Sequence, residues 1–185
     1  MSWEELNPPY RTIVADPPWP YDAKRHGNGA PSLRRPDPRP QPLGYSTMAV
    51  PKIVDIPVEP VAARAAHCYL WTTQRYVEAA FGVMGAWGFR YCELLTWCKT
   101  PNTKLGGTYI HTTEFCLFGK RGMLPHKERV ETTWFTWPRG PHSVKPAAFY
   151  DMVERVSPGP YLELFARQPR LGWDSWGWGY EEAKP

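Results

Sequence analysis

Short apolar runs alternate along this chain with segments of helical periodicity, and this alternation restricts the fold more than any other feature. The strand-like runs are rich in β-branched and aromatic residues. Residues 11–15 are too continuous in apolarity to be half exposed, whereas residues 131–137 alternate and look like a more exposed or edge strand. We predict strands over residues 11–15, 67–72, 89–97, 113–118, 131–137 and 161–165. Strands that alternate with helices are typical of an α/β domain with a mostly parallel sheet.

Two segments carry apolar residues at the spacing i, i+3, i+4, i+7, which places them on one face of a helix. The first is residues 74–86, with the stripe Val77, Ala80, Phe81 and Met84. The second is residues 146–156, with the stripe Phe149, Met152, Val153 and Val156. After the last predicted strand, residues 166–179 are rich in glycine and tryptophan, and we predict a loop there.

The composition fits one compact domain over residues 1–185 and excludes several classes of protein. A hydrophobic content of 42% and a charged content of 22% are ordinary for a chain that buries a core. The four cysteines form no C-x-x-C pair and the five histidines form no H-x-x-x-H pair, so we expect no metal site and free thiols. No apolar run reaches membrane-spanning length. We therefore expect a cytoplasmic protein with no membrane partner.

Residues 21–44 are the least core-like part of the chain. They are dense in proline, glycine and arginine and hold almost nothing to bury. We expect a flexible loop that faces the substrate, because it directly follows an unusual Asp-Pro-Pro-Trp tetrapeptide; a solvated insertion is the alternative. Arg34 and Arg35 either contact phosphates or are only solvated. The net charge of +4 permits nucleic acid as a partner without requiring it.

Asp16-Pro17-Pro18-Trp19 ends the first predicted strand and suggests a catalytic loop. In an open α/β sheet, ligands bind beyond the carboxyl ends of the strands. An adenine amino group is a poor nucleophile because its lone pair is delocalised into the ring. The Asp16 carboxylate and the Pro17 carbonyl can accept its N–H bonds, the prolines hold the loop rigid, and Trp19 can stack on the ring. A turn with one buried aromatic residue is the alternative.

The tetrapeptide resembles the catalytic motif of DPPW-type N6-adenine methyltransferases. Further segments follow in the order of one such family, that of the catalytic subunit of the eukaryotic mRNA m6A writer with its bacterial and phage relatives. These segments are Gly44–Met48, Leu70–Thr73, Trp97–Lys99, His142–Pro146 and Glu163–Arg167. A D/N/S-P-P-Y/F/W motif alone is shared across amino-methyltransferases, whereas DPPW with H-S-x-K-P and E-L-F-A-R in this order is far more specific. The chain resembles a prokaryotic or phage member.

The resemblance implies an S-adenosylmethionine-dependent, Rossmann-like fold with its motifs in permuted (β-class) order, the catalytic loop first and the cofactor strand last. It also implies that Asp16 lies near both the methyl donor and the target amine. The other residues implied in cofactor binding are His142, Ser143, Lys145, Glu163, Phe165, Arg167 and Trp178. Those implied in substrate binding are Tyr21, Tyr45, Lys99 and Glu114, with Arg34 and Arg35 of the loop. Within its apolar strand, Glu163 needs a partner, either a ligand hydroxyl or Arg167.

The sequence departs from the family at Trp178 and Gly179, where members commonly have Asn and a polar residue associated with the cofactor ribose. Either Asp174 or Glu181 takes over, or cofactor affinity is weak. The leading hypothesis is an adenine methyltransferase that acts on extruded or single-stranded bases of DNA, with RNA as the alternative. A non-catalytic nucleic-acid-binding subunit of a heterodimer is the competing class, and methylation of a small-molecule amine is a weaker option. Because one small domain fills little of a nucleic-acid footprint, we also expect a homodimer.

Overall fold

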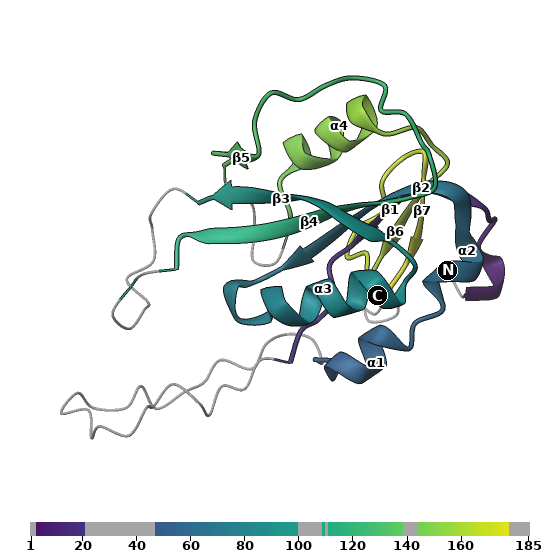
Figure 1. Cartoon of the computed structure of the whole chain (residues 1–185), viewed down its shortest axis with the longest axis horizontal. Helices are drawn as coiled ribbons and strands as arrows, with labels where there is room; N and C mark the ends of the chain where they lie inside the picture. Colours follow the sequence, from purple (N-terminus) through teal and green to yellow (C-terminus); the bar gives the residue numbers. More distant parts are fainter. Residues whose placement is uncertain (1–2, 21–46, 100–108, 110, 139–143, 178–185) are drawn as a thin grey trace, which may run out of the picture.

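A seven-stranded sheet with helices on both faces forms the body of the protein in the computed structural model (Figure 1). The structure describes residues 3–20, 47–99, 109, 111–138 and 144–177. The strands are β1 (Tyr10–Ala15), β2 (Ala62–Thr72), β3 (Arg90–Cys98), β4 (Thr113–Arg121), β5 (Trp134–Phe135), β6 (Tyr161–Leu164) and β7 (Trp173–Trp176). Their order across the sheet is β5-β3-β4-β2-β1-β6-β7. The α/β class predicted from the sequence is confirmed.

The central strand β1 is parallel to both of its neighbours, β2 and β6. Its last residue, Ala15, is paired with Leu70 of β2 and with Leu164 of β6, so the carboxyl ends of all three strands lie at the same edge of the sheet. Five of the six β1 residues are fully or almost fully buried, as expected for a strand covered on both faces. The residue that follows β1 therefore emerges at the edge where open α/β sheets bind ligands.

Among the described residues, four α-helices cover the sheet: α1 (Val50–Val54), α2 (Val58–Val61), α3 (Val77–Ala86) and α4 (Ala147–Val156). One core lies on the side of α1, α2 and α3, and it includes Ile53, Val83 and Trp87. A second core lies on the side of α4 and is largely aromatic, with Trp71, Trp97 and Phe149 among its members. Figure 1 shows α4 on one side of the sheet and α1 with α3 on the other.

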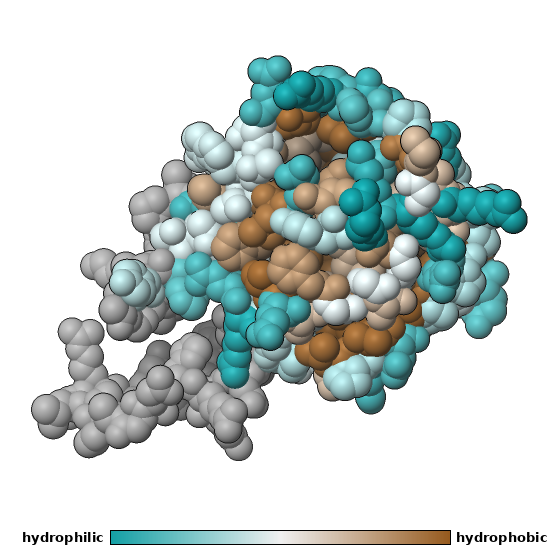
Figure 2. All heavy atoms as spheres, viewed as in Figure 1, coloured by the Kyte–Doolittle hydropathy of each residue, from teal (hydrophilic) through white to brown (hydrophobic). Residues whose placement is uncertain are grey.

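The face that α3 buries differs from the predicted stripe. Residues 74–76 form a short 3-10 turn, so the α-helix begins only at Val77. The buried residues are Ala80, Val83 and Met84, whereas Phe81 is 40% exposed and packs edge to face against Tyr91. The helix is apolar almost all round, so hydrophobic spacing alone did not identify its inner face. Figure 2 shows hydrophobic residues at the surface over α1 and α3.

Three other features of the sheet differ from the sequence prediction. The segment predicted as a loop, residues 166–179, contains the edge strand β7, which pairs in parallel with β6. Strand β4 continues past Gly119 to Arg121, because it pairs along this length with β2 and β3. It runs antiparallel to both, whereas the other six strands all run in one direction, so the sheet is mostly parallel as predicted. The predicted edge strand at 131–137 is confirmed as an edge but shrinks to the two residues of β5.

Candidate active site

The Asp-Pro-Pro-Trp segment leaves β1 as a tight, hydrogen-bonded loop. The Asp16 N–H still donates to the Leu164 carbonyl at 3.4 Å, which ties the start of the loop to β6. The Trp19 N–H then bonds the Pro17 carbonyl at 2.8 Å, and the Met48 N–H bonds the Pro18 carbonyl at 2.7 Å. Since the two prolines fix their own φ angles, these bonds leave the Asp16 side chain on a rigid support.

Trp19 serves this loop as an anchor. Its indole N–H donates to the Trp71 carbonyl at 3.0 Å, and its ring stacks on Tyr76 with 5.5 Å between centroids. Only 6% of Trp19 is exposed. The buried-aromatic interpretation of the tetrapeptide is therefore correct for Trp19, and one face of the ring is already covered by Tyr76. Stacking of a base on Trp19 stays a prediction.

Lys145 links the loop to the start of α4. Its ammonium lies 2.8 Å from Oδ2 of Asp16 and 3.3 Å from Oε2 of Glu114, and it also lies 5.0 Å above the centre of the Trp71 ring. Burial by itself would lower the pKa of Lys145, but Asp16 and Glu114 raise it above its ordinary value. The ammonium is thus a stable cation in contact with the Asp16 carboxylate.

Glu114 extends the charged group to Lys99. One carboxylate oxygen accepts from Lys145 and the other from Lys99, whose ammonium also lies 4.8 Å above the Trp97 ring. Burial favours the protonated form of Glu114, yet the two lysines more than offset this and lower its pKa. Lys99 and Glu114, both predicted to bind substrate, therefore join Asp16 and Lys145 in one row of alternating charges.

A cavity of about 450 Å³ opens beside this row of charges. It lies beyond the carboxyl ends of β1 and β6 and against the first turn of α4. Five residues predicted to bind cofactor line it: Asp16, Lys145, Glu163, Phe165 and Arg167. The structure thus brings together residues from three separate motifs of the sequence.

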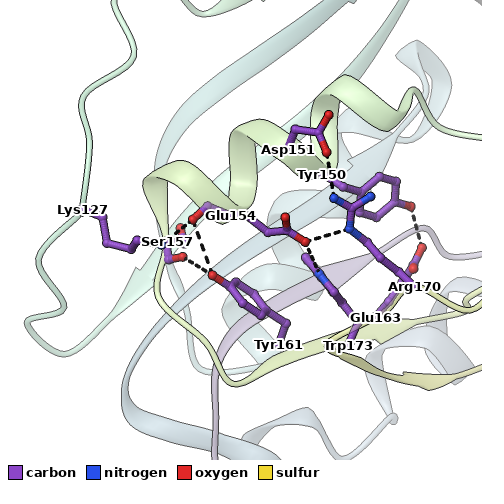
Figure 3. Close-up of polar contacts among 9 residues, drawn as sticks. All are labelled: Lys127, Tyr150, Asp151, Glu154, Ser157, Tyr161, Glu163, Arg170 and Trp173. Atoms are coloured by element: carbon purple, nitrogen blue, oxygen red, sulfur yellow. Dashed lines mark hydrogen bonds and ion pairs between the residues drawn. The ribbon is translucent and has the colours of Figure 1, made fainter.

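Glu163 forms part of the cavity wall, and its partner is Tyr150 of α4. The Tyr150 hydroxyl donates to Oε1 at 2.6 Å, a contact visible in Figure 3. Burial raises the pKa of Glu163 to about 7, although the hydrogen bond from Tyr150 acts in the opposite direction. The sequence required a partner for this carboxyl but did not identify Tyr150. The available signal was its place beside Phe149 on the helix that faces β6.

Arg170 also lines the cavity, and the sequence pattern did not identify it as a site residue. Its guanidinium donates to Glu154 at 2.7 Å and to Asp151 at 2.8 Å, and it lies 5.4 Å from the centre of the Tyr150 ring. Figure 3 shows these side chains reaching across from α4 to the loop after β6. The Trp173 N–H shares the same Glu154 oxygen at 2.7 Å. These contacts fasten the cavity loop to α4.

The turn after β6 has an unusual backbone. Phe165 has φ +64°, a left-handed conformation that is uncommon for a bulky residue and that often accompanies functional sites. Gly177 lies against this turn so closely that a Cβ there would be 2.5 Å from the Ala166 nitrogen. The residue that follows β7 is thus in close contact with the turn that forms part of the cavity wall.

Several predicted site residues lie outside the described residues: Tyr21, Arg34, Arg35, Tyr45, His142, Ser143 and Trp178, together with the whole of the predicted 21–44 loop. Asp174, considered as a substitute in the cofactor site, instead accepts a hydrogen bond from the Tyr10 hydroxyl at 2.5 Å. Tyr10 begins β1, so this contact lies at the end of the sheet away from the cavity. Asp174 therefore does not replace the missing family residue.

The described part of the chain contains no cluster of three or more His, Cys, Asp or Glu side chains arranged to hold a metal ion. The four cysteines are free; Cys68 and Cys116 are buried. Among the described helices, none has the length and apolarity needed to cross a membrane.

Comparison with known proteins agrees with this arrangement. The MT-A70 family model matches residues 10–179, which is most of the chain. The chain belongs to the MT-A70 family. A type II methyltransferase, M.MunI from Mycoplasma sp, is 27% identical over 179 residues, which cover 91% of this chain and 76% of that protein.

Eukaryotic relatives also match. A putative N(6)-adenosine-methyltransferase of the MT-A70-like type from Medicago truncatula is 29% identical over 91% of this chain and 26% of its own length. The human N(6)-adenosine-methyltransferase catalytic subunit METTL3 is 25% identical over 85% of this chain and 26% of its own length. The chain thus spans about a quarter of these relatives and most of the bacterial one. The Rossmann-like fold class implied by the resemblance is confirmed by family membership together with the α/β sheet.

Proposed function

We propose that this MT-A70 family member is an S-adenosylmethionine-dependent methyltransferase that modifies the N6 amino group of adenine, in DNA. The observation that carries the proposal is the position of Asp16. Its carboxylate stands on a rigid Pro-Pro loop at the carboxyl end of β1, beside Lys145 and on the wall of a cavity of about 450 Å³. A fixed acceptor at a cavity edge is what a weakly nucleophilic amine requires.

The residues that line the cavity fit S-adenosylmethionine, which is a flat base and ribose joined to a charged amino acid. When bound, it would supply an activated methyl group on sulfur. Phe165 offers an apolar surface, Glu163 a carboxyl for hydroxyl or amino groups, and Arg167 a cation for a carboxylate. The volume lies within the usual range for small-molecule sites. Lys145 also lines the cavity, but both carboxylates already engage its ammonium.

Within this proposal, the protein acts by positioning rather than by covalent chemistry. The Asp16 carboxylate and the Pro17 carbonyl accept the two N–H bonds of the adenine amine, which makes its lone pair available for transfer of the methyl group. The nitrogen would take the methyl group from the donor sulfur, which would leave as a neutral thioether, and would release one proton to water. Most of the rate gain then comes from orientation and from fixed electrostatics.

We propose DNA over RNA because the match extends over most of the bacterial type II methyltransferase. It covers 76% of the bacterial relative but about a quarter of the eukaryotic relatives that are named adenosine methyltransferases. An adenine amine is not accessible to such a cavity inside a stacked duplex, so the base must be extruded or single-stranded. A homodimer remains part of the proposal, since one small domain leaves room for further contacts with nucleic acid.

Transfer of labelled methyl groups to single-stranded DNA, duplex DNA and RNA tests the proposal. The protein is expected to label DNA, and Asp16→Ala is expected to lower the rate by about 100-fold or more because the amine loses its fixed acceptor. Asp55→Ala, which removes an exposed carboxylate at the end of α1, is the matched control and is expected to keep full activity.

Three outcomes would contradict the proposal. Equal labelling by Asp16→Ala would remove Asp16 from the reaction, and transfer to RNA alone would overturn the choice of DNA. Nucleic-acid binding without any transfer, together with no calorimetric binding of S-adenosylmethionine, would support the non-catalytic subunit instead.

A further inference from the structure

The Lys145 ammonium lies between two carboxylates, one just after the end of a strand and one near the start of another. Asp16 follows β1, and Glu114 is the second residue of β4. The distances from Nζ are 2.8 Å to Asp16 and 3.3 Å to Glu114. All three side chains are largely buried, with exposed fractions of 11% for Lys145, 17% for Asp16 and 21% for Glu114. Water therefore screens these interactions much less than it would at the surface.

An ammonium carries three N–H bonds, and the surroundings of Lys145 account for three directions. Two of them meet the carboxylates, and the Trp71 ring, 5.0 Å away, offers its negative face to the same cation. Because Lys145 bonds Oδ2 of Asp16, the described contacts leave Oδ1 as the acceptor for a target amine. The strength of Oδ1 as a hydrogen-bond acceptor depends on how much of the positive charge of Lys145 is neutralised by Asp16 alone.

Both carboxylate oxygens of Glu114 are engaged within the protein. Its Oε2 faces Lys145 and its Oε1 bonds Lys99. A carboxylate with both oxygens engaged by lysines is poorly suited to bind the substrate directly, which is the role that its place in the sequence suggested. Its geometry suits an indirect role instead.

We propose that Glu114 is a positioning residue that shares the Lys145 ammonium with Asp16, and so keeps the Asp16 carboxylate a strong acceptor for the target amine. This inference rests on the proposed methyltransferase function. If Glu114 were neutral, the ammonium would move toward Asp16 and compete there with the amine. Lys99 completes the arrangement, since it balances the second negative charge and leaves the row of two carboxylates and two ammoniums neutral overall.

Glu114→Gln tests the role, because it removes the charge and keeps the shape. We expect kcat for methyl transfer to fall by about tenfold or more, because the Lys145 ammonium would then bond Asp16 more strongly and weaken that carboxylate as an acceptor for the amine. The KM for the oligonucleotide and the Kd for S-adenosylmethionine should each stay within about twofold. Glu93→Gln is the matched control. It removes an exposed carboxylate from β3 and should leave kcat unchanged.

The split between kcat and KM separates the two roles. A higher KM with unchanged kcat would return Glu114 to direct substrate binding and overturn the positioning role. Unchanged kcat and unchanged KM would also overturn it. If Glu114→Gln does not fold, Glu114→Asp decides, because it keeps the charge and shortens the reach to Lys145. A fall in kcat at constant KM supports positioning, and wild-type kcat contradicts it.

A second readout does not depend on activity. In protein with ¹⁵N-labelled lysine, the Nζ resonance of Lys145, assigned with Lys145→Arg, reports the pKa of the ammonium. Loss of the Glu114 charge should lower that pKa, because Asp16 alone then holds the buried cation. An unchanged titration would show that the two groups are not coupled. This measurement needs no substrate. A wild-type protein that methylates nothing would therefore refute the proposed function, while the titration would still test whether Glu114 and Lys145 are coupled.

Discussion

The Glu163 carboxyl is placed so that its ionisation changes near neutral pH. It is 7% exposed, and burial raises its pKa to about 7, while the Tyr150 hydroxyl donates to it at 2.6 Å and favours the ionised form. Two opposed effects thus set the charge of one wall of the cavity. Any ligand that needs an ionised carboxyl here should bind more tightly above pH 7 than below it.

Removal of the Tyr150 hydroxyl is the direct test at the scale of one residue. Tyr150→Phe should raise the pKa of Glu163 above about 7, because the ionised form loses its hydrogen-bond donor. A carboxyl ¹³C titration by NMR measures the change. Tyr161→Phe is the control, since the Tyr161 hydroxyl bonds the Ser157 carbonyl and not Glu163. A titration of Glu163 that stays the same in Tyr150→Phe would rule out this account.

His67 shows how fully a buried polar side chain can be specified. Burial is the main reason that its pKa falls to about 4, so the ring is neutral. Nε2 lies 3.1 Å from the Leu124 carbonyl, which only accepts, so Nε2 carries the proton. Nδ1 therefore accepts from the Ser157 hydroxyl at 2.8 Å, and the Tyr69 hydroxyl donates to Ser157. Every polar atom of the ring is satisfied.

At the scale of elements, the contact between the end of β7 and the turn after β6 shapes the cavity wall. A Cβ on Gly177 would lie 2.5 Å from the nitrogen and 2.7 Å from the oxygen of Ala166. Both are backbone atoms, so a side chain cannot simply rotate away. The left-handed Phe165 stands directly before this contact.

Gly177→Ala should therefore lower the free energy of unfolding by about 1 to 3 kcal/mol, which is typical of overpacking against backbone. It should also weaken S-adenosylmethionine binding, because the wall of the cavity is displaced. Urea denaturation and calorimetry measure the two effects. Gly85→Ala is the matched control, since its Cβ meets nothing within 4 Å and alanine favours the helix. Equal stability of the two variants would refute the steric argument.

At the scale of the whole molecule, Glu163 and His67 make stability depend on pH in opposite directions. The folded-state pKa of His67 is lowered, so its contribution is present above about pH 6.5 and is lost as the pH falls toward 4. The folded-state pKa of Glu163 is raised, so its contribution is present below about pH 4.5 and is lost as the pH rises toward 7. We expect the two contributions to oppose each other between these limits.

Glu163→Gln should remove the loss of stability that accompanies ionisation of Glu163 near pH 7, and it keeps an acceptor for the Tyr150 hydroxyl. The free energy of unfolding at pH 8 should rise relative to the wild type by up to about 2 to 3 kcal/mol, with little difference at pH 4.5. Urea unfolding at several pH values measures this. A difference that does not change with pH would show that the carboxyl does not titrate as proposed.

The sequence by itself determined the parts that depend on local pattern. The apolar run that ends at Ala15 predicted a buried strand, and Asp16-Pro17 predicted a rigid turn at its carboxyl end. The stripe of Phe149, Met152 and Val153 predicted the inner face of α4 correctly, because the opposite face of that helix is polar. Where this contrast was missing, as on α3, the prediction placed Phe81 inside although it is exposed.

Only the tertiary structure decided which distant residues meet. Lys145 and Glu114 lie 31 positions apart along the chain, and each lies still farther from Asp16, so no spacing rule relates the three. Tyr150 became the partner of Glu163, and Arg170 fastened the cavity loop, through contacts between α4 and the segments that follow it. The physical reason is that local periodicity encodes which side of an element is apolar. The partners of a buried charge are set by the order and direction of the strands in the sheet. These bring the carboxyl ends of β1 and β6 and the amino end of β4 to one edge.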